Sequence, residues 1–181
     1  MTKRRLHPLR ILCTLSTLAV LGLGSAAFAQ NVGPIRVSMM NTDGDPAGDV
    51  WLWQTSDGVL ADIVLRNLPE GWHALRIHER GLCDPPDFAS AGDGYEFAGE
   101  ARGGDGPGQS PAGHLPSVRV GSDGEASFRT VIPNVSLAAD TSSPDDAPTL
   151  HDDDGSSIVL HAETTGTGGR IACGPVFLRD A

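Results

Sequence analysis

The stretch VWLWQTSDGVLADIVLRNL, residues 50–68, decides the fold class. Two apolar segments, 50–55 and 59–68, flank Asp57-Gly58, and Asp-Gly between apolar segments is a strong signal for a β-hairpin. Similar short apolar segments recur between turn residues along the chain, and no stretch of ten or more residues shows a capped helical period. We expect further strands at residues 35–40, 72–78, 118–120, 126–132, 157–162 and 170–177. About eight short strands predict an all-β fold, either a sandwich or a small barrel.

Two long segments lack this pattern of apolar segments and turns and are predicted to be loops. Residues 83–116 are rich in Gly, Asp and Pro, and residues 138–154 are acidic and polar. Long loops inside a compact domain are usually functional or disordered. The first loop begins at Cys83, directly after one of the expected strands.

The N-terminus resembles a secretory signal. A basic start at residues 3–5 is followed by an apolar run over 11–23 and by Ala27-Phe28-Ala29, a small-x-small cleavage site. We therefore predict a signal peptide at residues 1–29 and one domain at 30–181, located in the periplasm or secreted. A retained membrane anchor is the alternative, although the run is short for a bilayer span.

The charge balance excludes some classes of partner. The chain has 13 Lys and Arg against 23 Asp and Glu, a formal net charge of −10, and residues 1–29 contain no acidic residue. Phosphate binding needs a basic face, so a nucleic-acid partner is not expected. After removal of the signal, attraction to an anionic membrane is not expected either.

Two cysteines remain after the signal, Cys83 and Cys173. An exported chain folds in an oxidising compartment, where an even pair favours one disulfide. Two free buried thiols are the alternative.

The segment around residues 72–78 separates two kinds of side chain. Because side chains alternate along a strand, His73, Leu75 and Ile77 share one apolar face, and Arg76 and His78 share the other. We therefore interpret His73 as a core histidine rather than a ligand.

The segment GWHALRIHERGLCD, residues 71–84, resembles the signature of the copper/zinc superoxide dismutases. Residues 90–92 (SAG), 112–116 (AGHLP), 154–162 (DGSSIVLHA) and 169–174 (GRIACG) resemble other segments of that family, in the same order. The resemblance, which is to the bacterial periplasmic type, implies an eight-stranded Greek-key β-barrel with two long loops. It also implies a Cys83–Cys173 disulfide.

The same resemblance implies a degenerate copper site. The family holds copper with four histidines, and His78 and His161 match two of those positions. Arg76 and Gly94 stand at the other two. Arg170 matches the family arginine that guides the superoxide anion.

The zinc site is predicted to be lost. No histidine lies between Cys83 and Pro111, Pro111 stands at the last zinc histidine, and His114 stands at the zinc aspartate. One histidine is too few for a tetrahedral zinc site. His114 stays a candidate as a further copper ligand.

Arg76 is the most informative replacement. A guanidinium keeps its proton in proteins and cannot donate a lone pair to a metal. We hypothesise that Arg76 substitutes electrostatically for the missing cation and holds the acidic loop. A partly solvated arginine without such a role is the alternative.

Three functions remain open from the sequence. The first is an exported, weakly active or inactive member of the family, and the second is a superoxide dismutase with copper at a reduced site and superoxide as substrate. The third is a periplasmic copper-binding or carrier protein. The sequence names no protein partner.

Overall fold

The computed structural model describes residues 34–95, 115–133, 135–137, 149–150, 153–164, 166 and 168–177. The strands are β1 Ile35–Asn41, β2 Pro46–Thr55, β3 Gly58–Leu65, β4 Gly71–His78, β5 Val118–Val120, β6 Ala126–Ile132, β7 Ser156–His161 and β8 Arg170–Val176, with a 3-10 turn, η1, at Ala89–Ala91. Each strand expected from the sequence is present, with small differences at the ends. The predicted signal peptide lies outside the described residues and stays a prediction. No helix among the described residues has the length and apolar character needed to cross a membrane.

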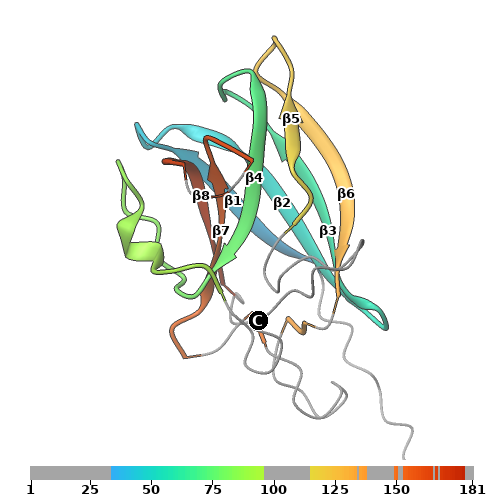
Figure 1. The fold of residues 1–181 in the computed structure, drawn as a ribbon. Coiled ribbons are helices and arrows are strands. Elements are labelled where there is room, and N and C mark those ends of the chain that lie inside the picture. The colour runs from blue at the N-terminus through green and yellow to red at the C-terminus, as the bar shows by residue number, and fades with distance from the viewer. Residues whose placement is uncertain are drawn as a thin grey trace, which may run out of the picture. The chain divides into compact units, whose positions relative to one another are not determined.

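The strands form one antiparallel sheet that curls into a nearly closed barrel (Figure 1). Their order around the barrel is β5-β4-β7-β8-β1-β2-β3-β6, so β3 and β4, which follow each other in sequence, are not neighbours. Strand β3 pairs with β6 instead, and β4 pairs with β5 and β7. The Greek-key, all-β fold expected from the sequence is thus confirmed.

The hairpin predicted at residues 50–68 forms as expected. Strands β2 and β3 pair in register from Gly48–Leu65 to Thr55–Gly58. Gly58 has a φ of +122°, and a Cβ at this position would overlap the carbonyl oxygen of Ile132 on β6. Glycine is therefore required here both by the backbone conformation and by the close approach of β6.

The barrel interior is filled by the inward-facing side chains of all eight strands. A second, smaller apolar cluster lies outside the barrel wall, where Phe88 and Ala91 pack on Val159 of β7 and Cys173 of β8. Figure 1 shows the segment after β4 beside these two strands. As a result, all six residues of β7 are buried.

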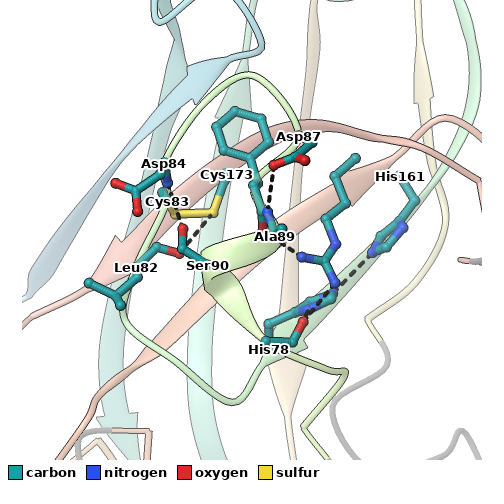
Figure 2. Close-up of a disulfide and its surroundings, with 12 residues drawn as sticks. His78, Leu82, Cys83, Asp84, Asp87, Ala89, Ser90, His161 and Cys173 are labelled. Atoms are coloured by element: carbon teal, nitrogen blue, oxygen red, sulfur yellow. Dashed lines mark hydrogen bonds between the residues drawn. A yellow bond between two sulfur atoms is a disulfide. The ribbon is translucent and has the colours of Figure 1, made fainter.

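The disulfide anchors this covering segment. Cys83 and Cys173 are bonded, with 5.6 Å between their Cα atoms and a sequence separation of 90 (Figure 2). The predicted disulfide is confirmed, and the alternative of two free thiols is wrong.

Candidate functional site

The site lies on the outer face of β4 and β7, beneath the covering segment. In the β4–β7 ladder Arg76 pairs with Val159, between the pair that contains His161 and the pair that contains His78. Leu75 points into the barrel core, so Arg76 and His78 share the opposite face, as predicted. Register therefore places Arg76, His78 and His161 on one face of the ladder.

Backbone carbonyls orient both imidazoles. Nδ1 of His78 lies 3.0 Å from the carbonyl oxygen of Gly92, and Nδ1 of His161 lies 3.1 Å from that of Gly168. A carbonyl oxygen only accepts, so each Nδ1–H donates, and in the neutral ring Nε2 then carries a lone pair. The two Nε2 atoms are 3.1 Å apart (Figure 2). Two lone pairs thus converge on one small space.

Burial keeps the histidine pair neutral near pH 7. Both side chains are buried, and desolvation lowers the pKa of His78 to about 4 and also lowers the pKa of His161. The positive charges of Arg170 and Arg76 lower both pKa values further. Deprotonated imidazole is the form that binds metals.

The donor pair fits two adjacent ligands of one metal ion. Two nitrogens bound at zinc-like distances to a tetrahedral ion would lie about 3.3 Å apart, close to the observed 3.1 Å. Imidazole nitrogen suits copper as well as zinc. The four-histidine copper site of the family does not fit, because Arg76 and Gly94 supply no ligand. Within the described residues, no group of three or more His, Cys, Asp and Glu side chains is placed to hold a metal.

Arg76 is seated against the short connection between β7 and β8. A Cβ at Gly166 would overlap Nε, Cζ and Nη2 of Arg76, and Gly166 has a φ of +71°. The same connection provides the carbonyl of Gly168 that orients His161. Burial lowers the pKa of Arg76, but a guanidinium remains charged throughout the physiological range.

Gly94 lies where the second missing ligand is expected. It forms an isolated β-bridge with His78, flanked by a hydrogen bond from the Tyr95 N–H to the Ile77 carbonyl. No described atom lies within 4 Å of where a Cβ of Gly94 would be. The backbone at Gly94 therefore lies beside His78 with open space among the described residues where a side chain would stand.

Arg170 borders a pocket beside the histidine pair. Its guanidinium donates to the carbonyls of Phe88 and Gly92, and Gly92 also accepts from His78. The pocket has a volume of about 700 Å³. Its lining residues are Glu79, Arg80, Pro86, Asp87, Ala89, Gly92, Asp93, Gly168, Gly169 and Arg170. Arg170 is thus held at the wall of a solvent-accessible pocket.

His73 belongs to the core, as expected. It is buried, with Nδ1 3.2 Å from the carbonyl oxygen of His161 and Nε2 2.9 Å from that of Pro69. The imidazole faces backbone oxygens on both sides, so it supports the strand that bears His161.

The predicted zinc-site positions lie outside the described residues. Pro111 and His114 belong to this group, so His114 stays a sequence-based candidate. Sequence reasoning missed Gly166, Phe88 and the two orienting carbonyls of Gly92 and Gly168. Side-chain patterns carry no signal for backbone acceptors, although glycine in "SAG" and in "TGTGG" marks where backbone approaches closely.

Known proteins resemble this chain over most of its length. Residues 46–176 match the family model for copper/zinc superoxide dismutase (SODC). A copper-zinc superoxide dismutase of Caulobacter vibrioides is 38% identical over 74% of this chain and 80% of that protein. The superoxide dismutase-like protein YojM of Bacillus subtilis is 26% identical over 95% of this chain and 97% of that protein.

A solved structure matches the fold. It is a double mutant of a SOD-like protein from Bacillus subtilis in which a tyrosine and a proline are changed to histidine. The TM-score is 0.66 at 28% identity, covering 79% of this chain and 97% of that chain.

Proposed function

The chain belongs to the copper/zinc superoxide dismutase family, and we propose that it is an exported member with little or no dismutase activity that binds one copper ion through His78 and His161. One observation carries the proposal: the two Nε2 atoms lie 3.1 Å apart, while both Nδ1 atoms are engaged by backbone carbonyls. A bound copper ion would supply one-electron redox chemistry at this point.

Replacement of two ligands supports the low activity. Arg76 offers no lone pair and Gly94 offers no side chain, so the described part of the site supplies two nitrogens. Two imidazoles are adequate for Cu⁺, whereas Cu²⁺ favours a tetragonal set with more ligands. Disproportionation of superoxide needs an ion that is stable in both states, and this donor set favours only one of them.

Metal binding and turnover test the proposal together. The purified protein is loaded anaerobically with Cu⁺, passed through a desalting column, and assayed for copper content and for superoxide disproportionation. We expect one equivalent of copper, lost in both His78→Ala and His161→Ala, with slow turnover. A wild-type protein that retains no copper would contradict the proposal.

His114 is tested in the same assay. If His114 acts as a third ligand, His114→Ala lowers copper retention as the two alanine variants of the pair do. If His114→Ala retains one equivalent, it serves as the matched control, because it also lacks one imidazole.

Full dismutase activity is the second candidate, and one observation favours it. Arg170 lies at the wall of the pocket beside the histidine pair, where a guanidinium would attract an anion such as superoxide. Fast turnover of the copper-loaded protein, reduced by Arg170→Met, would establish this function in place of the proposed one.

Export is proposed from the N-terminal sequence. Expression of the full chain in a bacterium, followed by fractionation and N-terminal sequencing, is expected to give a periplasmic protein that begins near residue 30. A cytoplasmic protein with an intact N-terminus would contradict export.

A further inference from the structure

Arg76 lies near the histidine pair on the outer face of the β4–β7 ladder. The Arg76–Val159 pair lies between the two pairs that contain His161 and His78, and all three side chains share this face. The guanidinium lies against Gly166 in the β7–β8 connection, which also provides the Gly168 carbonyl that orients His161. A permanent positive charge is therefore held on the face of the sheet that carries both imidazoles.

From this geometry we infer that Arg76 determines the charge of the metal ion that the histidine pair accepts, selecting monovalent Cu⁺ against divalent Cu²⁺ and Zn²⁺. This inference deepens the proposed copper site and rests on it. By this inference, Arg76 determines which ion binds, in addition to standing where the family has a copper ligand.

The physical reason is the difference between one and two unit charges. Repulsion between the guanidinium and a bound ion is proportional to the charge of the ion, so a divalent ion is opposed twice as strongly. At a separation of roughly 6 to 12 Å and an effective dielectric constant near 20, the extra unit charge costs roughly 10- to 100-fold in affinity.

Two arginines place positive charge near the histidine pair. Arg76 shares the outer face of β4 with His78, and Arg170 donates to the Gly92 carbonyl that also accepts from His78. Arg170 matches a family position, whereas Arg76 adds a charge where a neutral ligand is expected.

Affinities for three ions test the inference. Dissociation constants for Cu⁺, Cu²⁺ and Zn²⁺ are measured by competition with chromophoric chelators, anaerobically for Cu⁺. Cu⁺ and Zn²⁺ both have filled d shells, so their comparison isolates the charge of the ion. The variants are Arg76→Met, which removes the charge, and Arg76→Lys, which keeps it. Arg119→Met removes an exposed charge from neighbouring β5 and is the control.

In Arg76→Met we expect the preference for Cu⁺ over Zn²⁺ and Cu²⁺ to fall roughly 10- to 100-fold. Arg76→Lys and Arg119→Met are expected to keep the wild-type preference. An unchanged preference in Arg76→Met would overturn the inference while leaving the copper site intact. If Arg76→Met does not fold, Arg76→Gln, which also lacks the charge and keeps a polar end, takes its place.

The remaining outcomes separate the inference from the proposed function. If the wild-type protein binds no copper but Arg76→Met or Arg76→Gln binds Cu²⁺ or Zn²⁺, the exclusion of divalent ions by Arg76 stands, whereas the selection of Cu⁺ and the proposed function fail. If neither the wild type nor a folded uncharged variant binds any of the three ions, both are overturned.

Discussion

Strands β6 and β7 show how differently two walls of the same barrel are built. Along β6 half-buried and exposed residues alternate, so its outer face meets solvent. Along β7 every residue is buried, because the disulfide-anchored segment covers its outer face. The covered wall has a second apolar layer and a set of buried polar groups, including His78 and His161. The proposed copper site thus lies on the wall that is buried on both faces.

Removal of the disulfide should produce the largest difference in local stability between the two walls. It closes a loop of 90 residues, and replacing both cysteines with serine is expected to lower the free energy of unfolding by about 4 kcal/mol. Urea denaturation measures the loss. Hydrogen exchange should show added local opening at β7 and β8 rather than at β3 and β6. Equal added opening of both walls would remove the contrast that we draw.

Acid is expected to have the second-largest effect, by lowering the stability of the wall that contains His78. The pKa of His78 is about 4 in the fold and near 6.5 when unfolded, so below pH 6.5 the unfolded chain binds a proton that the folded chain does not. Stability is therefore full above pH 6.5 and falls as the pH drops towards 4. We expect a loss of about 2 kcal/mol between pH 7 and pH 5, measured by urea denaturation.

His78→Gln is the control for this titration. Without the buried imidazole, the slope between pH 7 and pH 5 should become smaller, leaving the part that arises from His161. An unchanged slope would mean that other groups dominate the acid response.

One substitution made on each wall sharpens the comparison. Val159 on β7 is fully buried on the outer face, whereas Val64 on β3 is 40% exposed. Val159→Ala is expected to cost about 2 kcal/mol from lost burial and the resulting cavity. Val64→Ala should cost less than about 1 kcal/mol, mostly from strand propensity. Equal losses in thermal or urea denaturation would show that the covering segment adds no packing.

The smallest effect belongs to the solvent-facing wall. Arg129 of β6 and Asp62 of β3 form an ion pair whose arginine side chain is 62% exposed. Asp62→Asn is expected to change the free energy of unfolding by less than about 1 kcal/mol, with the difference shrinking in high salt. A loss of several kcal/mol would show that this wall also depends on its polar contacts.

Alternation and turn residues predicted the strands of both walls, because each strand must bury at least one face. They did not predict which strands are neighbours, since alternation tells the face of a residue and not its partner. Thus β3 and β4 are adjacent in sequence but separated in the barrel. Burial on both sides of β7 was also not predicted, because the covering segment has no periodic pattern.

The candidate site was likewise predicted only in part from the sequence. His78, His161, Arg76 and Arg170 were identified from their match to a family signature, and the structure brings them together. The contact between the Arg76 guanidinium and Gly166 was not predictable, because it joins a strand to a loop that is distant in sequence. Its glycine-rich surroundings give no indication of which glycine meets the guanidinium.

Gly94 has a consequence for engineering the site. It forms a β-bridge with His78, flanked by the hydrogen bond from the Tyr95 N–H to the Ile77 carbonyl, with no described atom within 4 Å of the missing Cβ and no left-handed φ. Among the described residues, a larger side chain therefore has room here without rebuilding of the barrel. Gly94→His would add an imidazole beside His78 through a change of one side chain.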